Sequence, residues 1–429
     1  MKAEAMPIEL LRGTRDYDPE GAIKLREITS KIEEVFKRFG FYPIETPSLE
    51  STETLNAKAY GQEARKEMYT IDGSEAGLIY DLTVPLARYF SSNRSISLPF
   101  KRYQIGRVWR REEPQKMRSR ELIQADADIV GSAEPASDAE VIASTAISLE
   151  SVGLTGYTIL LSSRVFLSEV LSLFKVPQEK QSQAITAIDK LEKITAGGVR
   201  EQLLALGIDS QSADSLLNFI VEEGGNSEKL HKLATNCPGA KAEVDRMLMV
   251  LGLLSNYHLN GEVKIDLSLA RGLDYYTGAV WEFVEFKDGR RLPTIAAGGR
   301  YDRLIGIYAK TQQPAVGSSI GISRIYDLVQ IPDPRPTYAA VYVANIGPEN
   351  LDYAMTIANF MRAAGIYTDL NLTARSISKQ LEYANSMKVR YAVIVGTQER
   401  AANKVRMRDM SSRSEELLSL DEAISKAKG

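Results

Sequence analysis

A proline-rich stretch divides this chain into two parts. PDPRPT, residues 332–337, holds three prolines in six residues, and each proline fixes its own φ and lacks a backbone donor. Such a stretch is typical of an extended linker between domains. The chain has 429 residues, more than the ~250–300 at which a single core stops growing. We therefore expect two or three domains, with one boundary at this linker.

Beyond the linker, strand and helix patterns alternate to the end of the sequence. They occupy, in order, residues 338–344 (strand), 349–364 (helix), 366–370 (strand), 375–387 (helix), 391–395, 403–410 and 414–419 (strands) and 421–428 (helix). Strands separated by helices predict an α/β domain over residues 338–429, with a largely parallel sheet covered by helices.

The first 331 residues are rich in strand patterns at both ends and helical in the middle. Strands are expected at 98–111, 120–131, 157–162, 262–270, 275–287 and 293–298, and helices at 19–39, 138–152 and 315–329. Inside 166–256 the helical patterns fall at 181–195, 200–206, 212–222 and 239–256. We therefore predict a helical insertion, residues 166–256, within a domain built from residues 1–165 and 257–331.

The composition excludes several kinds of chemistry. A single cysteine, Cys237, rules out an intramolecular disulfide and a cysteine-based zinc site, and two histidines are too few for a histidine-rich metal site. The sequence contains neither the GxxxxGK[ST] phosphate loop nor a GxGxxG turn after a strand, and it lacks a GxSxG elbow. If the chain binds phosphate, arginines must hold it.

Charge and hydropathy bear on location and partners. The N-terminus, MKAEAMPIELLRGTRD, has no apolar core of a signal peptide, and no apolar run reaches the ~18 residues of a membrane span, so we expect a cytoplasmic protein. The net charge is −3, which gives no global sign of nucleic-acid binding. Positive charge gathers locally, because residues 101–120 hold eight Lys or Arg against two acids, and residues 335–429 hold 13 against 10.

The two strands within 98–131 carry a pattern that suits a charged ligand. Arg110 ends the first strand, Glu112 projects on the same side, and Arg118 follows in the polar loop EEPQKMRS. On the return strand, Gln124, Asp126 and Asp128 alternate with apolar residues and share one face. Arginines can pair with phosphate oxygens, and glutamine with carboxylates can bind an ammonium group. The alternative is a solvated hairpin with surface charges.

Three later segments place polar groups among apolar residues. RGLDYYTG at 271–278 holds an arginine and two tyrosines, and AAGGRYDRLIG at 296–306 has adjacent glycines that permit close approach of a ligand. AVGSSIGISRI at 315–325 places Arg324 in an apolar helix, where it needs a partner. A tight turn at Gly298–Gly299 and a structural ion pair for Arg324 are the alternatives.

With these motifs in order, the chain resembles the histidyl-tRNA synthetases, a family of class II aminoacyl-tRNA synthetases. The resemblance covers nearly the whole length and rests on GTRDYDPE, YDLTVPLARY, RVWRREEPQKMRSRELIQADADIVG, RGLDYYTG, AAGGRYD and VGSSIGISR. It implies a catalytic domain with an antiparallel sheet, a helical insertion and a C-terminal α/β anticodon-binding domain. The YDLTVP form is similar to archaeal and eukaryotic members.

The resemblance also implies roles for individual residues. The implied histidine-binding residues are Asp81, Thr83 and Gln124 for the α-amino group, and Asp128 and Tyr276, with Tyr301 nearby, for the imidazole. The implied ATP-binding residues are Arg110 at the α-phosphate, Arg118 near the γ-phosphate, Glu112, and Arg324 over the bent nucleotide. Arg271 is implied, with Arg110, as a catalytic arginine between the substrate carboxylate and the α-phosphate. Mg²⁺ is expected only with ATP, near Glu112.

The implied partners are L-histidine, ATP, tRNA(His) and a second copy of the chain. FGFYPIETP resembles the segment that builds the dimer interface, EEPQKMRS the loop that receives the tRNA acceptor end, and the basic surroundings at 101–120 suit phosphate contacts. In the C-terminal domain, Arg375, Lys379 and Lys388 are the cations expected to meet tRNA.

Two other functions are weighed against this one. An inactive paralogue that regulates ATP phosphoribosyltransferase in histidine biosynthesis would lack the anticodon domain and the catalytic arginines, and a synthetase for another amino acid would not carry RGLDYYTG. The sequence departs from the usual family pattern at Ile79, Leu122, Arg303 and Ser323. These departures leave open how adenine stacks and how Arg324 is supported.

Overall fold

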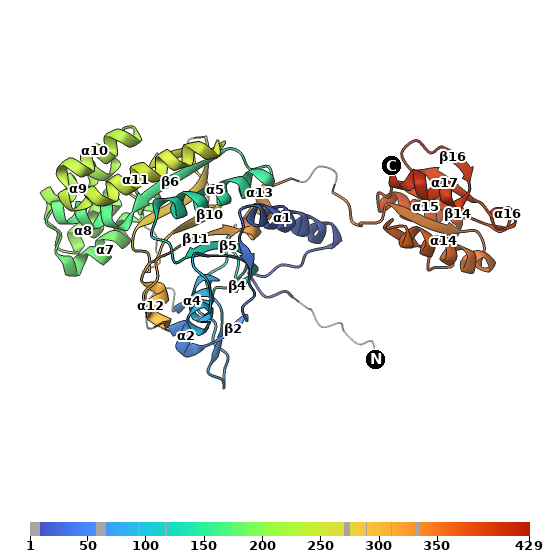
Figure 1. Ribbon diagram of the computed structural model, residues 1–429, viewed down its shortest axis with the longest axis horizontal. Coiled ribbons are helices and arrows are strands. Elements are labelled where there is room, and N and C mark those ends of the chain that lie inside the picture. Colours follow the sequence, from blue (N-terminus) through green and yellow to red (C-terminus); the bar gives the residue numbers. More distant parts are fainter. Residues whose placement is uncertain are drawn as a thin grey trace. The chain divides into compact units, whose positions relative to one another are not determined.

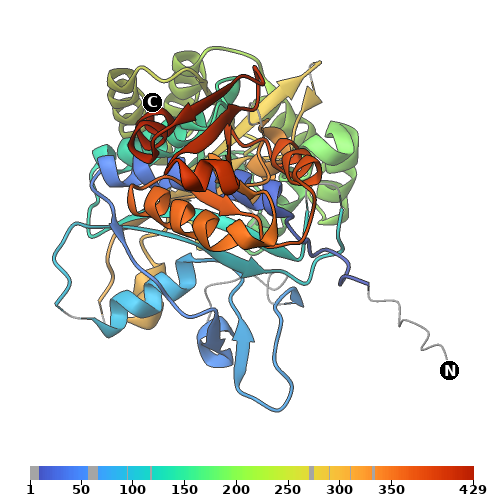
Figure 2. The same cartoon turned by 90° about the vertical axis from the view of Figure 1, so that its right-hand side faces the viewer.

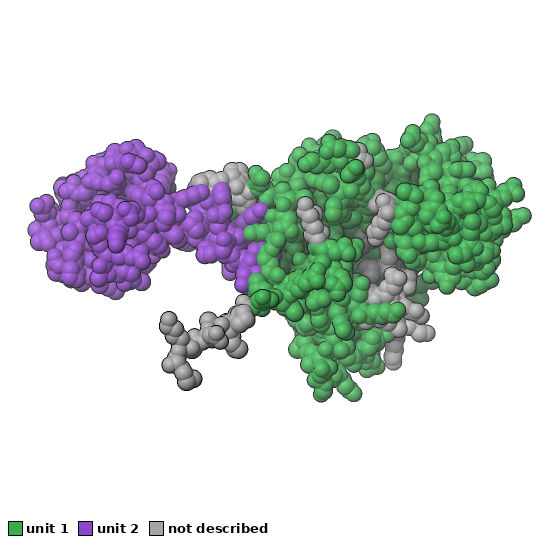
Figure 3. Space-filling view, turned by 180° about the vertical axis from the view of Figure 1, so that it is seen from behind, with its two compact units in different colours: residues 1–15, 27–330 green, residues 16–26, 331–429 purple. Residues whose placement is uncertain are grey.

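The computed structural model forms two compact units, one of residues 1–15 and 27–330 and one of residues 16–26 and 331–429 (Figure 3). The structure describes residues 9–56, 66–93, 95–115, 118–269, 275–288, 290–309, 311–330 and 334–429, without the side chains of residues 192 and 193. Part of the expected linker and Arg271 therefore lie outside the described residues.

A mixed sheet forms the centre of the larger unit (Figure 1). Its strand order is β1 (Tyr42–Pro43), β4 (Phe100–Trp109), β5 (Glu121–Val130), β11 (Ala315–Gly321), β10 (Ala296–Arg300), β8 (Ala279–Lys287), β6 (Tyr157–Ser163) and β7 (Glu262–Ile265), with β9 (Arg290–Arg291) beside β8. The interior ladders from β4 to β6 are antiparallel, and the outer pairs β1–β4 and β6–β7 are parallel. A separate pair joins β2 (Leu49–Ser51) and β3 (Ala76–Leu78).

Helices cover both faces of this sheet. The helices outside the insertion are α1 (Pro19–Arg38), α2 (Thr52–Asn56), α4 (Thr83–Ser92), α5 (Pro135–Ser151), α12 (Leu304–Tyr308) and α13 (Ile322–Leu328), and α6 (Arg164–Leu173) runs into the insertion. Helix α5 packs over β5, β10 and β11, while α4 and α12 pack together on the other side (Figure 1). An apolar cluster that includes Leu86, Val130, Val280 and Leu304 lies beneath α4 and α12. The central strands therefore have helices packed on both faces.

The expected insertion is helical throughout. It contains α7 (Gln178–Ile188), α8 (Leu191–Ala205), α9 (Ser210–Val221), α10 (Asn226–Asn236) and α11 (Lys241–Leu254), with short 3₁₀ turns at Pro238–Ala240 and Ser255–Tyr257. The pattern at 181–195 is divided between α7 and α8. Helix α10 was not predicted, because its buried apolar residues are few, with Leu230 and Leu233 three positions apart.

The predicted helix over 315–329 was wrong in its first half. Residues 315–321 form β11, a central strand of the sheet, and only Ile322–Leu328 are helical. Most residues of β11 are small. Gly317 leaves room for the Asp128 carboxylate on the next strand, because a β-carbon at this position would collide with that carboxylate. Pairing with β5 and β10 decided the conformation here, and local pattern did not reveal it.

The smaller unit holds a second sheet with helices on both faces (Figures 1 and 2). Its strand order is β13 (Thr368–Leu370), β12 (Val341–Asn345), β14 (Tyr391–Val395), β15 (Val405–Asp409) and β16 (Glu415–Leu418). Its helices are α14 (Leu351–Ala363), α15 (Ile377–Ser386), α16 (Thr397–Ala401) and α17 (Leu420–Lys428), with a 3₁₀ turn at Pro348–Asn350. The first three strands are parallel, as expected, but β15 and β16 run antiparallel.

The smaller unit has two apolar clusters, one on each face of its sheet, and successive residues of β12 belong to them in turn. Val341 and Val343 belong to a cluster with residues of α14 and α17, whereas Tyr342 and Ala344 belong to a cluster with residues of α15. A strand whose residues are apolar on both faces needs a helical layer on each side.

Candidate active site

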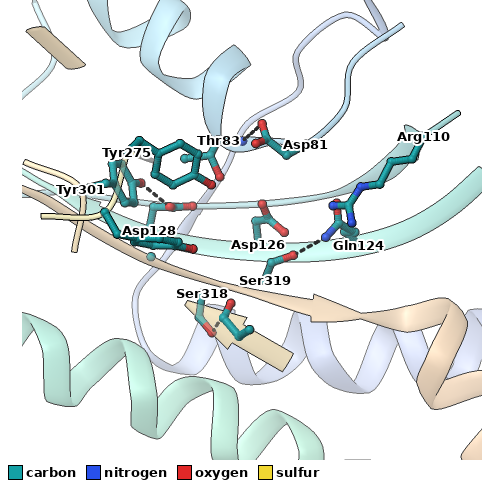
Figure 4. A pocket seen from close by; sticks show the side chains of 13 residues that line it. Asp81, Thr83, Arg110, Gln124, Asp126, Asp128, Tyr275, Tyr301, Ser318 and Ser319 are labelled. Atoms are coloured by element: carbon teal, nitrogen blue, oxygen red, sulfur yellow. Dashed lines mark hydrogen bonds between the residues drawn. The ribbon is translucent and has the colours of Figure 1, made fainter. Parts of the chain in front are cut away.

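A pocket opens on the face of the large sheet beneath the start of α4 (Figure 4). It is lined by Asp81, Thr83, Arg110, Gln124, Asp126, Asp128, Tyr275, Tyr276, Ala297, Tyr301, Gly317, Ser318 and Ser319. Most of these residues come from the central strands β5, β10 and β11 and from the segments that follow or precede them. The pocket thus lies over the central, antiparallel strands of the sheet.

The start of α4 holds two of the lining residues in place. The Asp81 Oδ1 atom accepts the backbone N–H groups of Thr83 at 3.1 Å and of Val84 at 3.0 Å. These N–H groups have no partner within the helix, so the carboxylate satisfies them and fixes the direction of the chain. Asp81 and Thr83 are consequently both buried beside the cavity.

Asp128 lies at the centre of a buried polar network. The Arg102 guanidinium on β4 lies 2.7 Å from Asp128 Oδ2 and donates to the Leu82 carbonyl at 3.1 Å. The Tyr301 hydroxyl donates to Asp128 Oδ1. Arg102 is fully buried and Asp128 is 2% exposed. Burial raises the pKa of Asp128, and the positive charge of Arg102 and the hydrogen bond from Tyr301 oppose that rise.

Gln124 and Asp126 project from the same face of β5. The Gln124 Nε2 atom donates to the Ser319 hydroxyl at 2.7 Å. Gln124 Oε1 and Asp126 Oδ1 are buried and accept no hydrogen bond from any described residue. With Asp81 and Asp128 they form an acceptor cluster (Asp81, Gln124, Asp126, Asp128). Buried acceptors without donors favour a ligand that brings N–H groups.

Tyrosines form the wall next to Asp128. The rings of Tyr275 and Tyr276 lie 4.8 Å apart, and Tyr275 meets Tyr301 edge to face at 5.8 Å. A β-carbon at Gly299 would lie 2.7 Å from the Tyr276 ring, so this glycine makes room for the tyrosine. Gly298 and Gly299 lie inside β10. The alternative of a tight turn was therefore wrong, and the approach of a ligand to these glycines stays a prediction.

Three arginines gather at the other side of the pocket. Arg110 donates to the Tyr80 carbonyl at 3.3 Å and stacks on the Tyr80 ring at 4.5 Å, and Arg118 lies 3.5 Å from Glu112. Arg324 donates to the Thr294 carbonyl. Burial lowers the pKa of Arg324, and the charges of Arg110 and Arg118 lower it further, while Glu112 opposes them. This arginine cluster (Arg110, Glu112, Arg118, Arg324) therefore favours an anionic ligand.

The departures from the family pattern have structural partners. The Ser323 hydroxyl accepts the Ile123 backbone N–H at 2.9 Å and so ties α13 to β5. Leu122 packs with Ile79, Leu82 and Val108 in a small apolar cluster beside the arginine cluster. Arg303 is exposed at the start of α12.

The structure brings seven predicted residues to one pocket and places three more beside it. Asp81, Thr83, Arg110, Gln124, Asp128, Tyr276 and Tyr301 line the cavity, whereas Glu112, Arg118 and Arg324 complete the arginine cluster. Arg271 lies outside the described residues. Sequence reasoning gave no role to Tyr275, Ser318 or Ser319, and it counted Arg102 only among the basic surroundings at 101–120. The signal for Arg102 was its register opposite Asp128, which needs the strand pairing.

The expectation that residues 101–120 offer a basic surface was only partly right. Lys101 pairs with Glu140 at 2.7 Å, and Arg102 is buried against Asp128. Arg107 pairs with Glu121 at 2.7 Å. These three cations are paired with acids of the same chain. Fewer positive charges therefore remain for phosphate contacts than the sequence count indicated.

Comparisons with known proteins decide the family. Residues 13–325 match the family model for histidyl-tRNA synthetase, and residues 340–429 match the model for an anticodon binding domain. The chain belongs to the histidyl-tRNA synthetase family. It has the class II synthetase fold, with a mixed sheet at the core of the catalytic part and a C-terminal anticodon-binding domain that has its own sheet.

Individual relatives agree with this assignment. A histidine–tRNA ligase of Korarchaeum cryptofilum (strain OPF8) is 38% identical over 415 residues, which cover 93% of this chain and 94% of the relative. The crystal structure of histidyl-tRNA synthetase from Nostoc sp. PCC 7120 superimposes with a TM-score of 0.85 at 28% identity and covers 99% of both chains. An ATP phosphoribosyltransferase regulatory subunit/histidyl-tRNA synthetase from Bacillus halodurans C shares the fold, with a TM-score of 0.77 at 20% identity over 92% of this chain and all of that one.

Membership in the family weakens the regulatory alternative. That alternative was expected to lack the anticodon domain, and here residues 340–429 match one. Across the described ranges, no group of three or more His, Cys, Asp or Glu residues is arranged to hold a metal ion. The same ranges contain no helix long and apolar enough to cross a membrane.

Proposed function

We propose that this chain activates L-histidine with ATP to form histidyl-adenylate and transfers the histidyl group to the 3′ end of tRNA(His). The observation that carries the proposal is one pocket with two unlike sides. The acceptor cluster offers buried oxygen atoms to a cationic or N–H-bearing ligand, and the arginine cluster beside it offers positive charge to phosphates.

In this proposal the acceptor cluster reads histidine. The α-ammonium group is held by Asp81, Thr83 and Gln124, and the two ring nitrogens by Asp128 and Tyr276. The Tyr301 hydroxyl and Arg102 hold Asp128 from behind. A side chain without the two ring nitrogens would leave these buried groups unpaired, and such mismatches are rejected by about 10⁴- to 10⁵-fold in other enzymes.

The arginine cluster holds the nucleotide. Arg110 lines the pocket, and Arg118 and Arg324 lie near it. In the proposal Arg110 contacts the α-phosphate, Arg118 contacts the distal phosphates and Arg324 covers the nucleotide. A Mg²⁺ ion that accompanies ATP needs one or two carboxylates besides phosphate oxygens, and Glu112, partly buried beside Arg118, fits that need. The ion would supply positive charge to the phosphates.

The first step is an in-line attack of the histidine carboxylate on the α-phosphorus. A bond forms between a carboxylate oxygen and the phosphorus, and pyrophosphate leaves with the electrons of the broken P–O bond. Negative charge spreads over the phosphoryl oxygens, so fixed cations stabilise the transition state more than a base would. We assign that task to Arg110 and to Arg271, the second of which lies outside the described residues.

The second step transfers the histidyl group to the terminal ribose hydroxyl of tRNA. The hydroxyl oxygen bonds to the acyl carbon, AMP leaves with the electrons of the broken C–O bond, and the hydroxyl proton is released. The anticodon-binding domain presents Arg375, Lys379 and Lys388 on its surface, and we propose that they contact tRNA. We propose a homodimer formed through residues 39–47, because Tyr42 is 65% exposed at the parallel outer strand β1. A cytoplasmic location agrees with a role in protein synthesis.

The proposal is tested by exchange of labelled pyrophosphate into ATP. The expected result is exchange that depends on L-histidine and is at least a hundredfold slower with the other amino acids. A folded protein without exchange, which instead binds and stimulates ATP phosphoribosyltransferase, would establish the regulatory alternative. Charging of tRNA(His) with labelled histidine then checks the second step.

A further inference from the structure

Asp126 is a buried carboxylate to which the family resemblance gives no role. It lies on β5 between Gln124 and Asp128, on the face that lines the pocket. Its partner on the neighbouring strand β11 is Ser319. In Figure 4 its side chain rises from the strand toward the side of the cavity where Asp81 lies. It is 2% exposed, and in the described part of the chain no donor reaches its Oδ1 atom.

The charges around Asp126 make an isolated anion there unfavourable. Burial raises the pKa of Asp126 to about 7, Asp128 on the same strand and Asp81 before α4 add to the rise, and Arg102 on β4 and the Ser319 hydroxyl oppose it. Three carboxylates thus share the neighbourhood of one buried guanidinium. A ligand that adds positive charge at this position would compensate the excess.

The position of Asp126 along β5 indicates which positively charged group of the ligand would lie beside it. Alternate residues of a strand are separated by roughly 6.6 Å, so Asp126 is one such step from Asp128 and one from Gln124. In the proposed function Asp128, which also contacts Arg102 and Tyr301, binds the imidazole, whereas Gln124 Oε1, like Asp126 Oδ1, has no donor within the described residues. An ammonium group carries three N–H donors and suits this pair of acceptors together with Asp81.

We propose that Asp126 is a further substrate-binding residue, whose carboxylate accepts a hydrogen bond from the α-ammonium group of the bound amino acid. This inference rests on the proposed function for the identity of that amino acid. The ammonium group stabilises the ionised form of Asp126, so binding near neutral pH releases a proton from this carboxyl group.

The test compares ligands that keep or lack the ammonium group. Calorimetric titrations are made with L-histidine, with histidinol, which keeps the ammonium group but has no carboxylate, and with 3-(imidazol-4-yl)propionate, which has no ammonium group. Asp126→Asn should weaken both ammonium ligands by about 10- to 100-fold, because a hydrogen bond to a charged group is lost. Binding of imidazolylpropionate should change less than threefold. Glu121→Gln, which removes a carboxylate from the same strand outside the cavity, should change none of them.

Proton release gives a second readout that a packing role would not move. Titration at pH 6.5 in buffers of different ionisation enthalpy should show more protons released on L-histidine binding by the wild type than by Asp126→Asn. The titration of the ligand's own imidazole is common to both proteins and cancels in the difference. If Asp126→Asn does not fold, Asp126→Ser replaces it in both experiments.

Two outcomes would overturn the inference. Equal weakening of all three ligands would assign Asp126 a structural role, and unchanged histidine affinity with unchanged proton release would remove it from the site. These results are separable from a failure of the proposed function, since that failure appears as absent histidine-dependent exchange in the wild type.

Discussion

At the acceptor cluster, Asp128 is buried between Arg102 and Tyr301, whereas at the arginine cluster Arg118 is 48% exposed and its one described ion pair, with Glu112, spans 3.5 Å. The opposite charges of Asp128 and Arg102 are fixed against each other before any ligand binds. In the arginine cluster, burial lowers the pKa of Arg324, and the like charges of Arg110 and Arg118 lower it further. The difference teaches that the Asp128 part of the amino-acid side is prebuilt, while Gln124, Asp126 and the phosphate side are completed by their ligands.

The largest effect is expected from Arg102→Ala, which breaks the prebuilt side. Removing one partner of a buried ion pair strands the other charge and costs about 3–5 kcal/mol of stability. We expect a comparable loss from chemical denaturation curves and no detectable histidine binding by calorimetry. Arg102→Lys, which keeps the charge, should recover part of the stability. A loss below about 1 kcal/mol for the alanine variant would show that Asp128 does not depend on Arg102.

A smaller effect is expected from Gly317→Ala, which adds one carbon beside Asp128. The new β-carbon would overlap the Asp128 carboxylate, so either the strand or the carboxylate must move, at a cost of about 1–3 kcal/mol. Histidine affinity should fall by roughly tenfold, with ATP affinity unchanged. Gly156→Ala, at a glycine whose added carbon meets nothing within 4 Å, is the matched control. Equal behaviour of the two variants would contradict the close fit on this side.

The smallest effect on stability is expected from Arg118→Ala, on the phosphate side. In its ion pair with Glu112, the Arg118 side chain is 48% exposed. Such exposed pairs contribute about 0–1 kcal/mol to the stability of a protein. The melting temperature should therefore stay within about 2 °C, while the KM for ATP rises several-fold. A large drop in stability without a change in the KM for ATP would show that Arg118 serves the fold.

The two clusters also differ in how well the sequence predicted them. The alternation of Gln124, Asp126 and Asp128 with apolar residues placed them on one face, because strand period is a local property. Arg102 could not be assigned in this way, since its partner lies across the β4–β5 ladder and its own neighbours look like a basic surface. Register, and with it the pairing of buried charges, is a tertiary property.

The same reason explains the error in the fold. Residues 315–321 are small and mildly apolar, and their local pattern does not distinguish a helix from a central strand. Their contacts with neighbouring strands explain Gly317, which makes room for the Asp128 carboxylate, and Ser318, whose hydroxyl accepts the Trp281 indole N–H. By contrast, the alternation in the C-terminal unit is repeated over several elements, and each predicted strand and helix of that unit has its counterpart in the structure.

The most direct test of the division between the clusters is calorimetric titration of both substrates into two variants, Asp128→Asn and Arg324→Ala. The account predicts a crossed pattern: Asp128→Asn loses about 10- to 100-fold in histidine affinity and binds ATP normally, and Arg324→Ala does the reverse. A parallel loss of both ligands in either variant would contradict it, because it would mean that the two sides of the pocket do not bind their ligands separately.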